Sequence, residues 1–170
     1  TTGIANTSIG NLAGYKLTGG TYNNFIGNRA GFNATTASNA VAIGRQAIGE
    51  GVMTGTDNTA IGQDAGFRLT SGTYNFFAGY QTGYNVTTAD NTIAIGKSAA
   101  SVATLTGDDN IMFGQLSGTR LTSGFSNIFI GKNTGKNGTT AYHNVAIGQD
   151  AMGLGVATGE GYNIAIGAQA

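Results

Sequence analysis

Residues 58–74 read NTAIGQDAGFRLTSGTY, and the opening pattern Asn-x-x-Ile-Gly returns with small changes along the whole chain. The glycines that end the pattern are Gly10, Gly27, Gly44, Gly62, Gly79, Gly96, Gly114, Gly131, Gly148 and Gly167. They are separated by 17, 17, 18, 17, 17, 18, 17, 17 and 19 residues. A period this regular indicates stacked solenoid coils, because each unit can bury its apolar residues only against its neighbours. Gly10, Gly62, Gly114 and Gly167 lie in similar surroundings, as a comparison of residues 58–74 with residues 110–126 shows, so three coils form a longer repeat of about 52 residues.

The residues before each repeat glycine predict a short β-strand with two apolar faces. One face carries a nearly unbroken aliphatic column directly before the glycine, which we expect to be the core ladder. This column contains Ile9, Ile26, Ile43, Ile61, Ile95, Phe113, Ile130, Ile147 and Ile166. The opposite face carries phase-locked large residues, which we expect at an oligomer interface: Phe25, Phe77, Met112 and Phe129. A strand that is apolar on both faces must be covered twice, and a further copy of the chain is the simplest second cover.

The rest of each coil carries three more fixed columns. Small residues such as Ala65 and Ala99 follow the glycine and predict a tight corner, and Leu17, Leu69, Leu121 and Val86 predict a second inward column. The asparagine that opens eight of the ten repeats predicts a ladder of stacked amides. Together these columns predict an all-β fold, a β-solenoid (β-roll or β-helix) of about ten coils of 17 to 18 residues. We expect residues 1–170 to form a single domain, and to be an excerpt of a longer fibre or filament.

The composition argues against several classes of partner. The 8 basic and 8 acidic residues give a formal net charge of +0, which offers no footprint for nucleic acid. No apolar run approaches the roughly 18 residues of a membrane span, so we expect no membrane insertion. The chain has no cysteine, which removes disulfides and thiolate metal sites.

The sequence offers no recognisable catalytic or metal-binding cluster. His143 is the only histidine, and we interpret it as a surface turn residue. Asp57, Asp90, Asp108 and Asp109 precede the repeat asparagine, where Asx turns explain them better than calcium ligation. We therefore predict no catalytic residue, no metal and no cofactor.

Two sets of surface residues are candidates for sugar chemistry. Lys16, Arg68 and Arg120 share one phase of the 52-residue repeat and would form a sparse basic row able to contact an acidic glycan, although solubilising charge is the simpler interpretation. Asn33, Asn85 and Asn137 begin glycosylation sequons at one phase. The aromatic residues Tyr15, Phe32, Phe67 and Tyr84 suit packing better than sugar stacking.

The Ala-Ile-Gly core of NTAIGQDAG (residues 58–66) and NVAIGQDA (residues 144–151) resembles the head repeats of trimeric autotransporter adhesins and similar repeats of bacteriophage tail fibres. The resemblance covers all ten coils. It implies a left-handed β-roll or β-helix that associates as a trimer and belongs to a particle that binds host surfaces. Coils of 17 to 18 residues are longer than those common in adhesin heads.

The leading hypothesis is a structural and attachment protein, located outside the cell, on a cell surface or on a virion. It would form a homo-oligomer and bind a host-surface glycan or protein. A self-stacking filament subunit, joined head to tail, is the close alternative. An ice-binding protein would use a threonine column that includes Thr18, Thr35, Thr70 and Thr104. A glycan-cleaving tail spike would need paired carboxylates, for which Asp64 and Asp150 are weak candidates.

Overall fold

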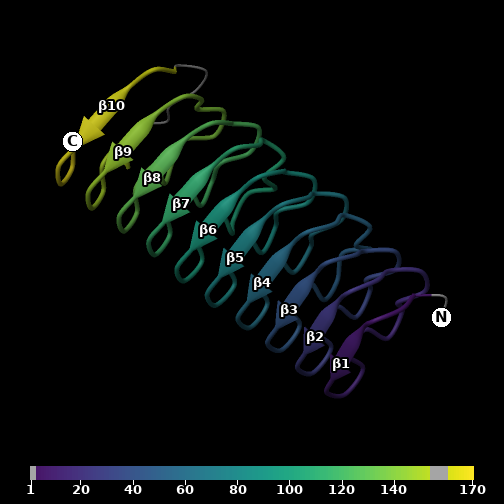
Figure 1. Ribbon diagram of the computed structural model, residues 1–170. Helices are drawn as coiled ribbons and strands as arrows, with labels where there is room; N and C mark the ends of the chain where they lie inside the picture. The colour runs from purple at the N-terminus through teal and green to yellow at the C-terminus, as the bar shows by residue number, and fades with distance from the viewer. Residues whose placement is uncertain (1–2, 154–160) are drawn as a thin grey trace.

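The computed structural model describes residues 3–153 and 161–170, and the regular elements in these ranges are all β-strands. The strands are β1 (Thr7–Ile9), β2 (Asn24–Ile26), β3 (Val41–Ile43), β4 (Thr59–Ile61), β5 (Phe76–Ala78), β6 (Ile93–Ile95), β7 (Ile111–Phe113), β8 (Ile128–Ile130), β9 (Val145–Ile147) and β10 (Ile164–Ile166). They form one ten-stranded parallel sheet in sequence order (Figure 1). The predicted all-β solenoid is confirmed. At about 4.8 Å between strands, the sheet is roughly 43 Å long.

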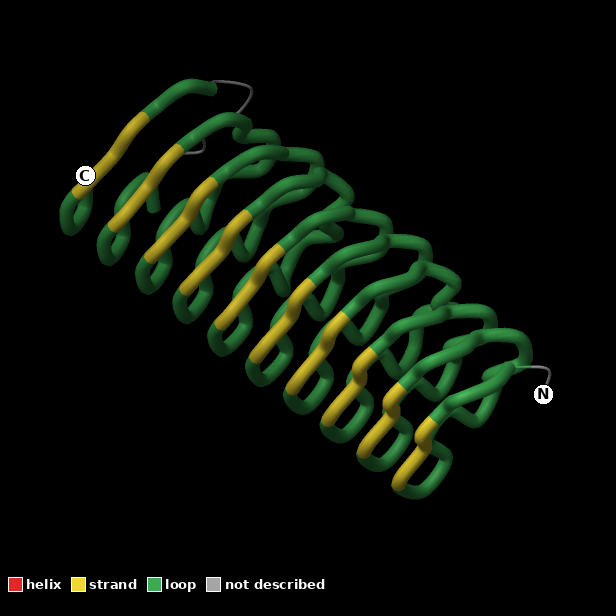
Figure 2. The backbone as a smooth tube through the Cα atoms, in the orientation of Figure 1, coloured by secondary structure: helices red, strands yellow, loops and turns green. Residues whose placement is uncertain are grey.

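Each coil contributes one short strand, and loops complete the turn of the solenoid (Figure 2). Equivalent positions of neighbouring coils are in register, so that Ala60 pairs with Phe77 and Ile61 with Ala78. Backbone hydrogen bonds also join the loops, as between the Gly66 N–H and the Thr82 carbonyl at 2.9 Å. Because both strands and loops are bonded from coil to coil, the stack forms a continuous rod.

The repeat glycine is required by the close stacking of coils just after the strand. Gly79 has a φ of +136°, which side chains of L-residues rarely adopt, and a β-carbon there would lie 2.7 Å from the Gly96 carbonyl oxygen. The glycine column therefore marks the point where successive backbones approach most closely.

The predicted orientation of the strand is wrong. The middle residue of each strand points into the rod, so Phe25, Phe77, Met112 and Phe129 are fully buried core residues within one chain rather than an oligomer interface. The predicted core ladder lies on the outer face of the sheet. Its members range from half-buried to clearly exposed: Ile9, Ile26, Ile43, Ile61, Ile95, Phe113, Ile130, Ile147 and Ile166.

The physical reason is the limited space inside the rod. The inner column mixes large and small residues, and in several coils the loop opposite it compensates. Phe25 and Phe77 lie in coils whose loop carries Gly31 and Gly83, whereas Ala42 shares its coil with the buried Ile48. Close packing of this kind varies from coil to coil and explains the 52-residue repeat. The outer face meets no such constraint within one chain, and eight of its ten third positions hold isoleucine.

The other predicted columns are confirmed. Leu17, Leu69, Val86 and Leu121 are buried against the core. The asparagine ladder forms as well: Asn75 donates its Nδ2 to the Asn58 Oδ1 at 3.0 Å and to the Ala89 carbonyl at 2.7 Å. The amide ladder therefore satisfies backbone groups at a bend where the chain makes no strand.

Candidate functional site

The outer face of the sheet is the most extensive unusual surface of the rod. Each strand presents its first and third residues outward, which gives two parallel columns of side chains. The first column comprises Thr7, Asn24, Val41, Thr59, Phe76, Ile93, Ile111, Ile128, Val145 and Ile164. The second comprises Ile9, Ile26, Ile43, Ile61, Ala78, Ile95, Phe113, Ile130, Ile147 and Ile166. We call these two columns together the outer face.

The outer face is apolar, solvent-facing and continuous. In the middle of the rod Ile93 is 40 % exposed and Phe113 is 52 % exposed, although both lie between neighbouring strands. Toward the C-terminal half the face contains only apolar residues, since Thr7, Asn24 and Thr59 all belong to the first four coils. Monomeric proteins rarely leave a contiguous apolar patch of several hundred Å² in water, so this surface is suited to a partner.

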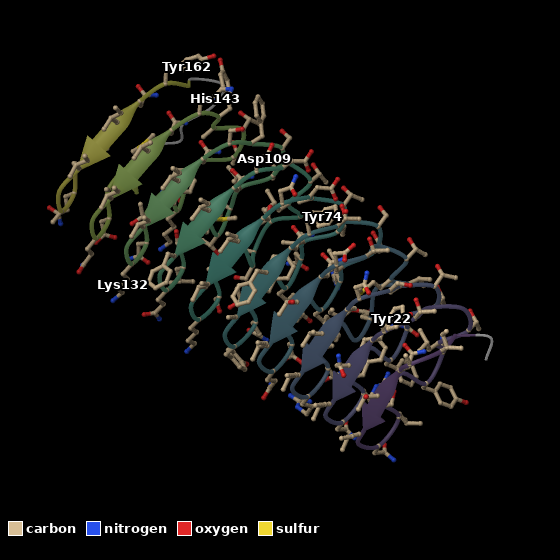
Figure 3. The ribbon with its side chains drawn as sticks, viewed as in Figure 1. Tyr22, Tyr74, Asp109, Lys132, His143 and Tyr162 are labelled. Carbon is tan, nitrogen blue, oxygen red and sulfur yellow. The ribbon has the colours of Figure 1, made fainter. Side chains whose placement is uncertain are left out.

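Two rows of polar residues border the outer face at opposite ends of the strands (Figure 3). The residue directly after each repeat glycine forms the carboxyl-end row, to which Lys132 belongs. The residue five positions before each glycine forms the amino-end row, which contains Tyr22, Tyr74, Asp109, His143 and Tyr162. All the members of the amino-end row described in the structure have a φ between +52° and +66°. This left-handed turn aims the row away from the core at the start of each strand.

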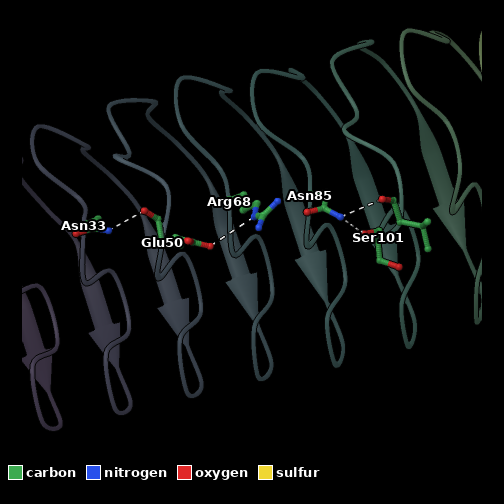
Figure 4. Close-up of polar contacts among 6 residues, drawn as sticks. Asn33, Glu50, Arg68, Asn85 and Ser101 are labelled. Carbon is green, nitrogen blue, oxygen red and sulfur yellow. Dashed lines mark hydrogen bonds and ion pairs between the residues drawn. The ribbon is translucent and has the colours of Figure 1, made fainter.

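The predicted basic row exists, but its charges are partly engaged. Lys16, Arg68 and Arg120 lie in one column of the stack, three coils or about 14 Å apart. Arg68 forms an ion pair with Glu50 at 3.4 Å (Figure 4). Arg120 donates to the Asn137 Oδ1 at 3.5 Å. Lys16 lies 5.6 Å from the Phe32 ring centroid. This column is bordered by stacked rings, Tyr15 on Phe32 and Phe67 on Tyr84, on the surface of the rod.

The predicted sequons serve as links between coils. Asn33 donates its Nδ2 to the Glu50 carbonyl at 2.7 Å, and Asn85 donates to the carbonyls of Ser101 and Val102 (Figure 4). Asn137 donates to the Gly153 carbonyl at 2.7 Å. The Nδ2 atom that would carry a sugar is therefore occupied by a structural hydrogen bond. A glycan at these positions would have to share that atom with the neighbouring coil.

His143 lies in an aromatic cluster at the amino-end row. Its ring stacks on Tyr162 at 5.1 Å and meets Phe125 edge to face at 5.1 Å, while Phe125 stacks on Tyr142 at 5.5 Å. The cluster forms because equivalent positions of successive coils lie above one another, which stacks Phe125 on Tyr142 and His143 on Tyr162. His143 is an exposed turn residue, as predicted.

The carboxylates weighed for catalysis do not meet within one chain. Asp64 and Asp150 lie five coils apart, or about 24 Å at sheet spacing, which is too far for a carboxylate pair. Hydrogen bonds from Asn133 and from Gln149, with weaker help from Lys132 and Lys136, lower the pKa of Asp150 below that of an ordinary aspartate. Within the described ranges, no three acidic or histidine side chains gather in a way that could hold a metal ion.

The threonine column considered for ice binding is also tied into the stack. The hydroxyls of Thr18, Thr70 and Thr122 donate to carbonyls of the next coil, and Thr106 rather than Thr104 takes the equivalent place in its coil. Hydroxyl protons used in this way are not free to order water on a surface.

Comparisons with protein-family models, with curated proteins and with solved structures give no match. The class of the protein therefore rests on its own residues and fold, which are those of a parallel β-solenoid repeat protein. Among the described residues, no helix is long and apolar enough to cross a membrane.

Sequence reasoning missed the two bordering rows. Their signal was present, since Arg45, Lys97 and Lys132 each follow a repeat glycine. Only the orientation of the outer face reveals that these residues flank an exposed surface.

Proposed function

We propose that this chain is a structural and attachment protein, a rod segment of an extracellular fibre or adhesin. Copies of the rod associate through the outer face, and the assembled particle binds a glycan or a protein on a host surface. By its resemblance to adhesin-head and tail-fibre repeats, the assembly is a trimer, and it does no catalysis.

The observation that carries this proposal is the apolar outer face. Seven of the ten coils place Val, Ile or Phe at the first outward position, and every coil places an apolar residue at the third. The outer face is about 43 Å long and, with three-residue strands, about 10 Å wide, so its two columns alone offer roughly 430 Å². The two bordering rows widen the contact toward the about 800 Å² per partner that stable protein complexes bury.

The construction of the rod supports a mechanical role. Its hydrogen bonds run from coil to coil, so force along the axis is shared by strands, loops and the asparagine ladder. Such a rod holds a binding surface at a fixed distance from its anchor, which is what attachment requires.

The test is the solution mass of the purified chain by light scattering, for the wild type and for Ile130→Lys. We expect a discrete trimer for the wild type and a folded monomer for the variant, because a charge on the outer face must be desolvated in the assembly. Val102→Lys is the matched control, since Val102 is 58 % exposed on a loop away from the sheet, and it should stay trimeric.

A wild-type chain that stays monomeric at high concentration would contradict the proposal. Long polymers that survive Ile130→Lys would instead favour the self-stacking filament. For the attachment role, saturable binding of the fluorescent trimer to intact host cells is expected, and its absence across candidate hosts would remove that role alone.

A further inference from the structure

The two rows that border the outer face carry opposite charges. Every charged residue of the carboxyl-end row is basic: Arg45, Lys97 and Lys132. The carboxylates of the amino-end row are Asp57 and Asp109, and Asp90 and Asp108 lie one residue before it. Neither of these two amino-end positions holds a lysine or an arginine in any described coil. The outer face therefore has a basic rim on one side and an acidic rim on the other.

Within the described ranges, the rim charges Arg45, Lys97, Asp57 and Asp109 form no ion pair. Among the described residues the one ion pair joins Arg68 and Glu50, which lie in another column. Arg45 donates to the adjacent Gln46, and Lys97 lies 5.9 Å from the Tyr80 ring centroid. Asp57 accepts a hydrogen bond from Asn39 at 3.0 Å. Arg45, Lys97, Lys132 and Asp109 are exposed, so they are available to a partner.

The charges on the two rims also share one period. Arg45 and Lys97 are 52 residues apart, and so are Asp57 and Asp109. Along the chain Arg45 comes between Asn39 and Asp57, and Lys97 comes between Asn91 and Asp109. A partner that aligns one base with one carboxylate therefore aligns the second pair as well.

We propose that the occupant of the outer face is a second copy of this chain running in the same direction, with its acidic rim against the basic rim of the first. This inference rests on the self-association in the proposed function and adds its polarity and register. Rotation about an axis along the rod places the carboxyl-end row of each copy beside the amino-end row of its neighbour. Arg45 then faces Asp57 of the next copy, and Lys97 faces Asp109.

The opposite polarity is disfavoured by the same charges. An end-over-end rotation about the strand direction would bring the outer faces together, but each rim would then meet its own copy. Bases would face bases along one side and carboxylates would face carboxylates along the other. Charge complementarity of this kind selects the partner and fixes its register more than it adds affinity.

Two other acidic residues near the basic rim do not reverse its sign. Asp64 follows the carboxyl-end row by one residue, but only 7 % of it is exposed, and it accepts from Gln63. Asp150 accepts from Asn133 at 2.8 Å and from Gln149 at 3.1 Å. Both residues keep their negative charge, but the three bases Arg45, Lys97 and Lys132 still outnumber these two carboxylates along the rim.

The experiment compares three variants of the whole chain by sedimentation equilibrium. Arg45→Glu with Lys97→Glu places like negative charges at both proposed pairs, and Asp57→Lys with Asp109→Lys places like positive charges there. The quadruple variant combines all four changes and exchanges the two charges within each proposed pair. Lys16→Glu with Arg120→Glu is the matched control, because it makes the same charge change in an exposed column away from the rims.

We expect each rim double variant to raise the dissociation constant by about tenfold or more. The quadruple variant should return within about threefold of the wild type, as should the control. If both rim double variants associate like the wild type, or if the quadruple variant fails to recover while melting like the wild type, the inference is wrong. In either case a wild-type oligomer that Ile130→Lys still dissociates would leave the proposed function standing.

A second measurement, disulfide cross-linking, tests directly whether the two copies run in the same direction. The chain has no cysteine, so Lys97→Cys and Asp109→Cys can be introduced in separate copies that are then mixed and oxidised. A disulfide needs α-carbons within about 7 Å, so a parallel assembly gives mixed Lys97→Cys/Asp109→Cys dimers. Cross-links of Lys97→Cys or of Asp109→Cys with itself, in place of mixed dimers, would overturn the proposal.

Discussion

Gly83 lies so close to Phe77 that a β-carbon on this glycine would be 2.8 Å from the ring Cδ1 atom. The glycine also has a φ of +63°, so the left-handed turn and the space for the ring are provided by one residue. The same relationship links Gly31 to Phe25 and Gly135 to Phe129. These pairs recur every third coil and set the long repeat.

Replacing Gly83 by alanine should lower the free energy of unfolding by about 2 kcal/mol or more, because the new methyl group overlaps the Phe77 ring in a well-packed interior. Phe77→Ala should cost about 3 to 5 kcal/mol through the cavity that it leaves. Urea unfolding followed by circular dichroism measures both.

The double variant Phe77→Ala with Gly83→Ile is a sharper test of the same packing. It rebuilds the arrangement of Ala42 and Ile48, whose φ is already +49°. We expect the double variant to be less destabilised than the sum of the single changes by at least about 1 kcal/mol. Simple additivity would show that the two positions do not share one space.

Replacing a single amide of the asparagine ladder should lower the free energy of unfolding strongly. Asn127 is fully buried, donates to Asn110 at 3.0 Å and to the Ala141 carbonyl at 2.7 Å, and accepts from the Asn144 N–H at 3.1 Å. Asn127→Leu leaves these groups without partners. Each group that remains buried should lower the free energy of unfolding by about 1 to 3 kcal/mol. Asn28→Leu, at an exposed position, is the control and should change the urea midpoint little.

Asn127→Thr should fall between these two variants, because Thr92 fills the same position in the sixth coil and its N–H still bonds to the Asn75 Oδ1. A threonine variant as unstable as the leucine variant would contradict the view that the ladder tolerates interruption.

Self-association predicts a melting temperature that depends on protein concentration. Partners that bind only the folded chain stabilise it by mass action, so the melting temperature of the wild type should rise with concentration. Ile130→Lys should abolish this dependence. Calorimetry over a hundredfold range of concentration measures it, and a wild-type curve that does not move would argue for a monomer.

The lowered pKa of Asp150 should make the stability of the fold depend on pH in the acid range. Hydrogen bonds from Asn133 and Gln149 lower its pKa in the folded state, so its ionised form stabilises the fold above the ordinary aspartate pKa of 3.8. That contribution is lost as the pH falls through the lowered pKa. Asn133→Ala should raise the pKa of Asp150 toward its ordinary value, as followed by the carboxyl carbon shift in NMR, whereas Asn11→Ala should leave it unchanged.

Much of the architecture could be predicted because a period is a property of the chain alone. The spacing of Gly62, Gly79 and Gly96 specified the coil length, and the asparagine and leucine columns followed from the same phase. The candidate surface could not be identified in the same way. Phe77 and Ile61 belong to equally regular apolar columns on the two faces of one strand, and period-two alternation does not say which face is inside.

The sequence by itself determined the repeat, the parallel stacking, the glycine corner and the amide ladder, since each needs only a fixed residue at a fixed interval. The tertiary structure decided the orientation of the strand. Inside the rod, Phe77 fits because Gly66 and Gly83 leave room for its ring, and Ala42 fits because Ile48 fills the space beside it. This match of volumes joins residues of neighbouring strands and loops, and it leaves the isoleucines of the outer face, with their two charged rims, exposed to a partner.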